Sequence, residues 1–262
     1  MSMETIQTRR EGHVLHVVLN RPEVLNAFDE TLIGELTECF KGIRKTDPAR
    51  VVCLGGQGKV FCAGGDLGWM RRAAAWSKAD NRKDAMCLFG MLLAIRECPK
   101  PVVAAVRGYA LGGGSGLCAA ADRVIAEETA VFGFTEVRLG IIPGAISPFV
   151  VEKIGAGHAR DLFSSGRRFR APKAKEIGLA HDVVPEGMLD EAVAEALKDY
   201  RNAAPKASMD AKRLAKDVAA GLKDFPSLGP RVAARIAAKR VDAEAKAGFA
   251  AFFAKKPPTW AS

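Results

Sequence analysis

The 262-residue sequence lacks the paired cysteines that a zinc site or a disulfide framework requires. Its six cysteines are scattered, and no two of them form a C-x-x-C unit. We expect most of them to serve as small apolar core residues. Histidine is scarce as well, and His13 and His16 stand three positions apart in a β-rich run, so that their side chains point to opposite faces of a strand. We therefore predict no metal site.

Long apolar runs are absent too. No stretch approaches the roughly 20 apolar residues of a membrane-spanning helix, and the polar residues 1–10 contain no apolar segment of the kind that a signal peptide carries. Hydrophobic residues still make up 48% of the chain, which is enough for a sizeable buried core. We expect a soluble, cytoplasmic protein that has no membrane partner.

The net charge of +9 is the feature that could indicate nucleic-acid binding. However, the basic residues are dispersed, and clusters such as Arg71-Arg72 and Arg167-Arg168 have no aromatic residues interleaved for base stacking. The positive charge can equally belong to a solvated surface, or it can attract a polyanionic small molecule. We favour the small molecule and expect no nucleic-acid partner.

The hydrophobic pattern alternates between strands and helices over most of the chain. Strands are expected at residues 13–19, 51–54 and 101–106 and around Val124 and Val131, and helices at residues 30–43, 78–96 and 117–121. Asp29 can cap the first of these helices. Such alternation predicts an α/β fold with a mainly parallel sheet.

From about residue 187 onward the pattern is helical throughout. Residues 187–200, 204–222 and 230–253 read as successive Ala- and Lys-rich helices with no strand between them. We expect an α/β core over residues 1–200 and a helical C-terminal region over residues 201–262. Helices of this composition bury little apolar surface alone, so packing on a neighbouring subunit is the natural role of this region.

Two glycine-rich turns share one design. Residues 61–67 follow the strand around Val52, and residues 108–116 follow the strand around Val103. Each turn joins a strand to an expected helix start. Glycine lets a ligand approach the backbone, and a helix N-terminus offers unpaired N–H groups at a positive dipole end. Two such turns can direct two N–H donors at one developing negative charge.

Three common glycine motifs do not fit these turns. A dinucleotide fingerprint and a serine-hydrolase elbow both fail because Leu117 stands where each would need glycine. A phosphate-binding loop fails because no G-K-[ST] unit follows either turn.

The spacing of several segments together resembles the enoyl-CoA hydratase/isomerase (crotonase) family. The similar segments are residues 19–22, 25–27, 63–67, 108–116 and 132–144, with Phe252 and Lys255 near the C-terminus. The resemblance implies a spiral of ββα units, followed by a C-terminal α-helical segment that mediates homotrimers, which usually pair into hexamers. It also implies an acyl-CoA thioester as substrate, with coenzyme A arriving as part of it and no separate cofactor.

The same resemblance assigns the site residues. The backbone N–H groups of Gly65 and Gly113 would form an oxyanion hole, and Glu136 would be the acid/base. Its apolar surround of Phe134, Val137 and Leu139 would raise its pKa and suit it to both roles. The expected substrate-binding residues are Leu25, Ala27, Ala63, Gly65, Asp66, Leu67, Gly68, Gly113, Gly116, Arg138, Phe252 and Lys255. Lys255 would bind a CoA phosphate, across a subunit boundary.

The sequence departs from the family pattern at Gly116, where hydratases usually carry a second glutamate. Asp122, the next carboxylate, lies most of two helical turns further on. Either Glu136 works alone with water supplied by other groups, or the reaction needs only one acid/base, as a double-bond shift does. A second departure is at Glu23 and Gly68, where many relatives have lysines that contact CoA.

Two side motifs favour hydration. Residues 66–70 and 141–149 resemble a bacterial branch related to methylglutaconyl-CoA hydratases, whose members can also carry glycine at the position of Gly116. We therefore predict hydration of a short branched or carboxylated 2-enoyl-CoA. Arg138 could meet the free carboxylate of such a substrate, although a structural ion pair would account for it equally well. A Δ3,Δ2-enoyl-CoA isomerase that uses Glu136 alone and an acyl-CoA-binding protein with little activity are the alternatives.

Overall fold

The computed structural model describes residues 3–261, so Met1 and Ser2 of the polar N-terminus lie outside the described part. Its larger sheet has the strand order β1-β2-β3-β4-β6-β9. The strands are β1 (Ile6–Glu11), β2 (Val14–Leu19), β3 (Val51–Gly56), β4 (Val102–Val106), β6 (Arg123–Glu127) and β9 (Asp182–Val184). Only β1 pairs antiparallel, through a hairpin with β2. The predicted mainly parallel sheet is confirmed.

A smaller sheet is formed by β5 (Tyr109–Leu111), β7 (Val131–Gly133) and β8 (Arg168–Arg170). The two sheets share a repeated unit: β4 joins the larger sheet, β5 joins the smaller sheet, and helix α4 (Gly113–Ala120) follows; β6, β7 and α5 (Ser147–Ser165) repeat this order. The isolated bridge of Cys62 to Ala110 adds the segment after β3 to the smaller sheet. This repetition is the spiral of ββα units that the resemblance implied.

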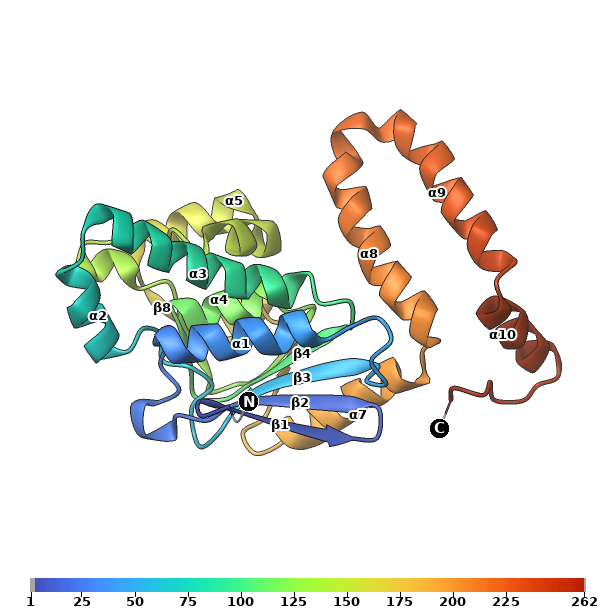
Figure 1. The fold of residues 1–262 in the computed structure, drawn as a ribbon, viewed down its shortest axis with the longest axis horizontal. Coiled ribbons are helices and arrows are strands. Elements are labelled where there is room, and N and C mark those ends of the chain that lie inside the picture. The colour runs from blue at the N-terminus through green and yellow to red at the C-terminus, as the bar shows by residue number, and fades with distance from the viewer. Residues whose placement is uncertain (1–2, 262) are drawn as a thin grey trace.

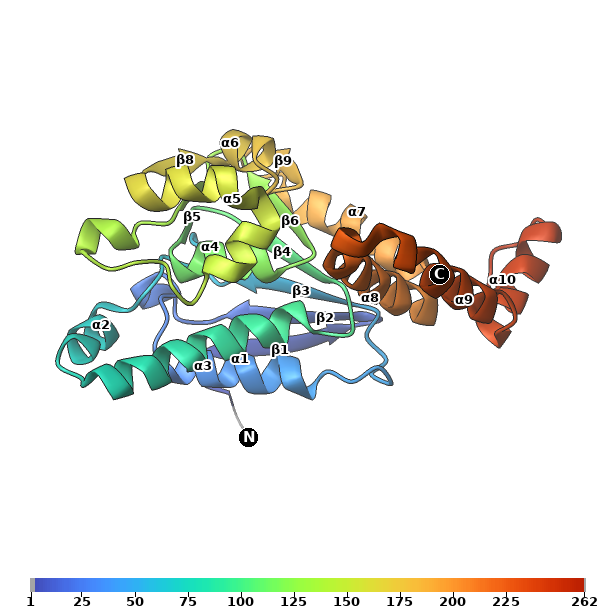
Figure 2. The ribbon, with the colours of Figure 1, turned by 90° about the horizontal axis from the view of Figure 1, so that it is seen from above.

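Helices cover both faces of the larger sheet (Figures 1 and 2). Helices α1 (Glu30–Gly42), α3 (Lys78–Arg96), α4 and α5 pack in the main core against strand residues such as Val52 and Leu54. On the other face, α7 (Leu189–Asn202) packs against the alternate residues Val51 and Cys53. The shorter helical elements are α2 (Leu67–Ala74), α6 (Ala171–Glu176), and the 3₁₀ turns η1 (Pro22–Val24) and η2 (Glu136–Leu139).

The sequence signals for two helices match the structure closely. The side chain of Asp29 accepts a hydrogen bond from the N–H of Leu32 over 2.9 Å, so Asp29 caps α1 as predicted. The expected helix over residues 78–96 coincides with α3. Four of the six cysteines (Cys53, Cys62, Cys98 and Cys118) are buried, which confirms their role as core residues.

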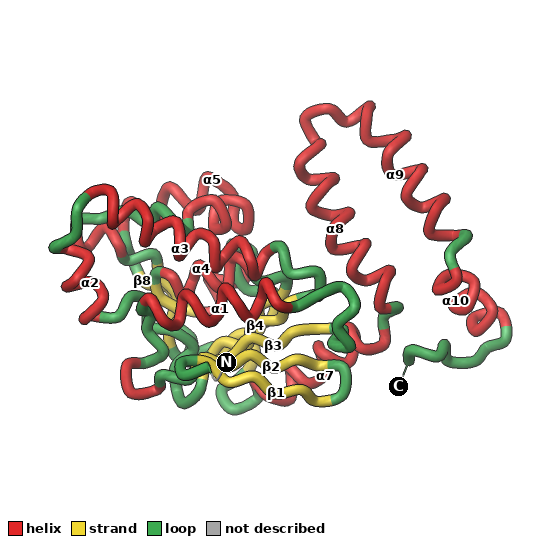
Figure 3. Tube along the Cα trace, in the orientation of Figure 1, coloured by secondary structure: helices red, strands yellow, loops and turns green. Residues whose placement is uncertain are grey.

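The last three helices stand apart from the core as an extended arm, α8 (Pro205–Gly221), α9 (Phe225–Arg240) and α10 (Ala243–Phe253), with η3 (Leu222–Asp224) between α8 and α9 (Figures 1 and 3). The prediction of one helix over residues 230–253 was wrong. The chain breaks at Val241, and the side chain of Asp242 caps a new helix by accepting from the N–H of Ala245 over 2.8 Å. Pro230 lies inside α9 instead of starting a helix.

Candidate active site

The two glycine turns lie side by side. Cys62 and Ala110 form a parallel bridge, in which the N–H of Leu111 donates to the carbonyl oxygen of Cys62 over 3.1 Å. A Cβ atom at position 114 would lie 2.5 Å from that same carbonyl oxygen. Because the contact is with backbone, which cannot swing aside, only glycine fits at position 114 while the turns stay this close.

A second bridge leaves the N–H of Gly65 available. Phe28 pairs with Gly65, but the bonds run from the N–H of Phe28 to the carbonyl of Gly64 (2.7 Å) and from the N–H of Asp66 to the carbonyl of Phe28 (2.8 Å). The N–H of Gly65 takes no part in this bridge. It stands just before α2, and it can donate to a ligand.

Gly113 is the first residue of α4, so its N–H is one of the four that an α-helix leaves without an intrahelical partner. The preceding Gly112 has φ +50°, a left-handed conformation that favours glycine. A Cβ atom at position 113 would lie 2.6 Å from Cε2 of Phe28. The buried ring of Phe28 therefore packs on one turn while its backbone pairs with the other, and it holds the two turns together.

The carboxyl group of Glu136 lies at the second turn. Its Oε1 atom is 3.3 Å from the position that a Cβ atom on Gly112 would occupy. Its Oε2 atom is buried and has no hydrogen-bond partner. Burial raises the pKa of Glu136, and only its own backbone N–H opposes the shift. A desolvated carboxyl beside a row of helix N–H groups can both take and return a proton.

A backbone hydrogen bond joins the predicted CoA-contacting turn, residues 25–27, to the first glycine turn. The carbonyl of Leu25 accepts from the N–H of Ala63 over 3.0 Å, and Leu25 itself is about half exposed, with φ +55°. Asn26 between Leu25 and Ala27 is fully buried, and its side-chain amide donates to the carbonyls of Gln57 and Val60. These bonds fix the shape of a turn whose flanking backbone can meet a ligand.

Asp66 has structural partners. Its side chain accepts from the N–H of Trp69 over 3.0 Å, which caps α2, and it lies 3.5 Å from the guanidinium of Arg21. A Cβ atom on Gly68 would lie 3.0 Å from Oδ1 of Asp66. Leu67, by contrast, is largely exposed at the start of α2. Of these three predicted binding residues, Leu67 is the one whose side chain is open to a ligand.

An apolar side chain fills the space at Gly116. A Cβ atom at position 116 would lie 2.7 Å from Cγ2 of Ile146 and 3.4 Å from Cδ1 of Leu92. Asp122 does not replace the missing glutamate: its carboxylate accepts from the N–H of Val102 over 2.7 Å and pairs with Lys212 over 2.6 Å, at the far end of α4. Asp66 also lies in a glycine turn, but it caps α2 and pairs with Arg21. Glu136 is thus the carboxyl at the glycine turns, among the described residues, that has an oxygen without a partner.

Three predicted residues lie elsewhere in the isolated chain. Arg138 is exposed, and its Nε atom lies 3.5 Å from the position of a Cβ atom on Gly166, at the end of α5. Phe252 and Lys255 belong to the end of the arm, which Figure 1 shows well separated from α2 and α4. They can reach a glycine-turn site only on another subunit.

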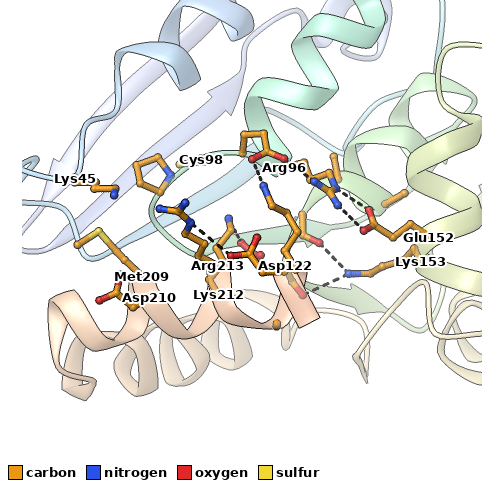
Figure 4. A pocket seen from close by; sticks show the side chains of 18 residues that line it. Lys45, Arg96, Cys98, Asp122, Glu152, Lys153, Met209, Asp210, Lys212 and Arg213 are labelled. Carbon is orange, nitrogen blue, oxygen red and sulfur yellow. Dashed lines mark hydrogen bonds and ion pairs between the residues drawn. The ribbon is translucent and has the colours of Figure 1, made fainter. Parts of the chain in front are cut away.

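A cavity of about 560 Å³ lies between α8 and the core, away from the glycine turns. Figure 4 shows its charged side chains directed toward one another: Lys212 pairs with Asp122, and Arg96 pairs with Glu152 over 2.5 Å. Lys216 bonds Glu97 as well. Because these charged side chains are paired with one another, they link the arm to the core. They are therefore not free to bind a substrate in this cavity.

Comparison with known proteins decides the family. The family model described as enoyl-CoA hydratase/isomerase matches residues 9–262. The chain belongs to this family. A Thermus thermophilus relative, named provisionally as an enoyl-CoA hydratase, is 35% identical over 250 residues, which cover 95% of this chain and 97% of that protein.

Solved structures of the enoyl-CoA hydratase/isomerase fold agree closely. AtuE of Pseudomonas aeruginosa superposes with a TM-score of 0.94 at 34% identity, covering 99% of this chain and 100% of that one. An enoyl-CoA hydratase from Shewanella pealeana superposes with a TM-score of 0.93 at 34% identity, covering 98% and 96%. Within residues 3–261, no helix has both the length and the apolar character needed to cross a membrane.

Three residues shape this enoyl-CoA hydratase/isomerase site without a role predicted from the sequence: Asn26 and Ile146, which were named only within the segments 25–27 and 141–149, and Phe28, which was not named. Asn26 carried a signal, since a buried asparagine in a turn with φ +56° is a common way to tie a loop to backbone carbonyls. Phe28 and Ile146 carried none, because their contacts are with glycines far away in the chain.

Proposed function

We propose that this protein hydrates a 2-enoyl-CoA thioester reversibly, with the N–H groups of Gly65 and Gly113 as oxyanion hole and Glu136 as the acid/base. The observation that carries the proposal is the carboxyl of Glu136 beside the start of α4, whose Oε2 atom is buried and has no hydrogen-bond partner. The names of the relatives support it. Each oxyanion-hole donor is typically worth about 3–4 kcal/mol of transition-state stabilisation.

The reaction can proceed with one carboxylate. The oxygen of water bonds to the β-carbon while a water proton passes to Glu136, and the electron pair of the double bond moves through the α-carbon onto the thioester oxygen as an enolate. The protonated Glu136 then returns a proton to the α-carbon, and the C=O bond re-forms. One water is added in total, and Glu136 ends in its starting state.

We further propose a short branched or carboxylated acyl group, on the strength of the motifs at residues 66–70 and 141–149. The surroundings are apolar: a Cβ atom on Gly65 would lie 3.2 Å from both Sδ of Met70 and Cζ3 of Trp69. Recognition of a free carboxylate by Arg138 requires its side chain to leave Gly166 and turn toward the substrate.

A Δ3,Δ2-enoyl-CoA isomerase is the second candidate, favoured by the apolar filling at Gly116. Glu136 would remove a proton from the α-carbon to give a thioester dienolate, held by the same oxyanion hole, and would return the proton to the γ-carbon. No water needs to be held, so a single carboxyl is sufficient for this reaction.

We also propose a homotrimer or a pair of trimers as the active assembly. The arm exposes large apolar side chains, among them Ile236, Phe249, Phe252 and Phe253, on helices that bury almost nothing in their own chain. A neighbouring subunit would cover them. The same contact would bring Lys255 to the CoA end of another subunit's site.

One panel tests these proposals. The purified protein is mixed with crotonyl-CoA, 3-methylglutaconyl-CoA and a 3-enoyl-CoA, and the products are followed by mass. A gain of one water supports hydration, and a new isomer of unchanged mass supports the isomerase. Absence of turnover on all three, with CoA esters still bound, would favour an acyl-CoA-binding protein.

A further inference from the structure

The segment that carries Glu136 crosses α4 and touches it at two glycines. At its start, Oε1 of Glu136 lies 3.3 Å from the Cβ position of Gly112. At its end, Cγ2 of Ile146 lies 2.7 Å from the Cβ position of Gly116. The N–H of Gly116 donates to the carbonyl of Gly112 over 3.0 Å, so the two contact points are one helical turn apart.

The Ile146 end of this segment is firmly buried, and Pro143 within the segment is buried as well. Ile146 is 2% exposed. It packs against Gly116 together with Leu92, which is fully buried. Between the two contacts, Leu139, Ile141 and Ile142 are mostly exposed. The segment is positioned by the burial of Ile146 and Pro143 and by Val137, whose Cγ2 lies 2.8 Å from the Cβ position of Gly166. At the carboxyl end, one oxygen of Glu136 has no hydrogen-bond partner.

We propose that Ile146 is a positioning residue for Glu136, and that its seat on Gly116 fixes the segment 136–146 over α4 and so aims the carboxyl at the thioester. This inference rests on the proposed function, in which Glu136 moves the proton. It also explains the glycine at position 116, since any side chain there would displace Ile146.

Steady-state kinetics of four variants test the proposal on the substrate that the wild-type protein turns over best. Ile146→Ala is expected to lower kcat about 10- to 100-fold, because a shift of about 1 Å in a catalytic group can cost that much. KM should stay within about threefold, since the CoA-binding turns are untouched. Ile146→Val keeps the Cγ2 methyl and should retain most of kcat.

The variant Gly116→Ala tests the same contact from its other side. Its methyl group would push on Ile146 and should also lower kcat. In the double variant Gly116→Ala/Ile146→Ala the loss should be clearly smaller than the product of the two single losses, because the shortened side chain makes room for the methyl group. Multiplicative losses would contradict the proposed contact.

Ile125→Ala is the matched control, because Ile125 is equally buried but lies on the other face of the larger sheet against α7. It should lose stability and keep kcat. Where Ile146→Ala fails to fold by circular dichroism, Ile146→Leu replaces it, since leucine keeps the volume and lacks the methyl that touches Gly116.

Two outcomes separate this inference from the proposed function. Wild-type kcat in folded Ile146→Ala, together with an inactive Glu136→Gln, would overturn the role of Ile146 alone. Full activity of Glu136→Gln would overturn the proposed function, and this inference would fall with it.

Discussion

At the scale of single residues, the site depends on small side chains that let backbone and one carboxyl meet. Glycine at positions 113 and 114 admits the Phe28 ring and the Cys62 carbonyl to distances that any Cβ atom would forbid. Glu136 is held beside them without a hydrogen-bond partner on Oε2. Its charge is therefore costly in the empty site, and it becomes useful when a substrate offers a proton.

Removal of the Glu136 carboxyl should abolish most of the chemistry while binding persists. We expect Glu136→Gln to lower kcat by at least about 100-fold, the usual contribution of a positioned acid/base. The dissociation constant for a saturated acyl-CoA analogue, measured by calorimetry, should change little. Glu136→Asp serves as the control for charge, because it keeps the carboxylate and withdraws it by one methylene.

The pH dependence follows from burial, which raises the pKa of Glu136. The base must be ionised, so kcat/KM should fall as the pH drops through a pKa above the ordinary glutamate range. The folded protein also binds this proton more readily than the unfolded chain does, so this group contributes stability at low pH that is lost as the pH rises through its folded pKa. Thermal melts should show this component disappear in Glu136→Gln.

Restoring a glutamate at position 116 should fail on steric grounds. Because Ile146 occupies the space, we expect Gly116→Glu to lower the free energy of unfolding by about 1–3 kcal/mol, the usual cost of overpacking. Urea denaturation measures the change. In the Ile146→Ala background the same substitution should lower the free energy of unfolding by less. Equal losses of stability in both backgrounds would show that the Ile146 side chain moves aside without cost.

At the scale of elements, α8 is attached to the core by charge. The helix buries no residue in its own chain, whereas Lys212 pairs with Asp122 and also donates to the carbonyl of Lys100 over 3.1 Å. Glu244 of α10 accepts from the N–H groups of Lys206 and Ala207, which caps the start of α8. α8 is thus held to the core by polar contacts along its length, from Lys212 and Lys216.

Loss of the Lys212 contact should loosen the arm. We expect Lys212→Met to lower the free energy of unfolding by about 1–3 kcal/mol, since Asp122 keeps its charge and loses its cation. Cleavage at residues 203–204 by a protease should become faster. Lys198→Met, which removes a pair exposed on both sides, should change stability by less than about 0.5 kcal/mol.

At the scale of the whole molecule, the arm presents more apolar surface than a lone chain can cover. A groove of about 860 Å³ runs between α8, α9 and α10, lined by residues such as Leu214, Ile236 and Phe249. Phe252 and Phe253 project from the end of α10 and are more than three-quarters exposed. Such surface supports the proposed homotrimer or pair of trimers.

Charge placed at the end of α10 should therefore break the assembly. We expect the wild-type protein to elute as a trimer or hexamer and Phe252→Asp/Phe253→Asp as a smaller species, because burial of two carboxylates in an apolar contact is strongly unfavourable. Light scattering after size exclusion gives the masses. Glu191→Gln, at an exposed position of α7, is the control. An unchanged mass in the double variant would remove α10 from the interface.

The sequence by itself determined the α/β class, most strands, the capped α1, the full length of α3 and the pair of glycine turns, because periodicity, capping and turn chemistry act between near neighbours. Its local patterns did not reveal β1, whose outward residues are polar and exposed. They did not reveal the ββα repetition either, which has no counterpart in repeated residues and was implied only by the family resemblance.

Only the tertiary structure decided which distant residues meet at the site. Phe28 joins two turns that are far apart in the chain. Ile146 fills the space at Gly116, the position at which hydratases of the family usually carry a second glutamate. Such contacts depend on how helices and loops pack across the spiral, which local patterns do not encode. The separation of Phe252 and Lys255 from the glycine turns follows likewise from the direction in which α8 leaves the core.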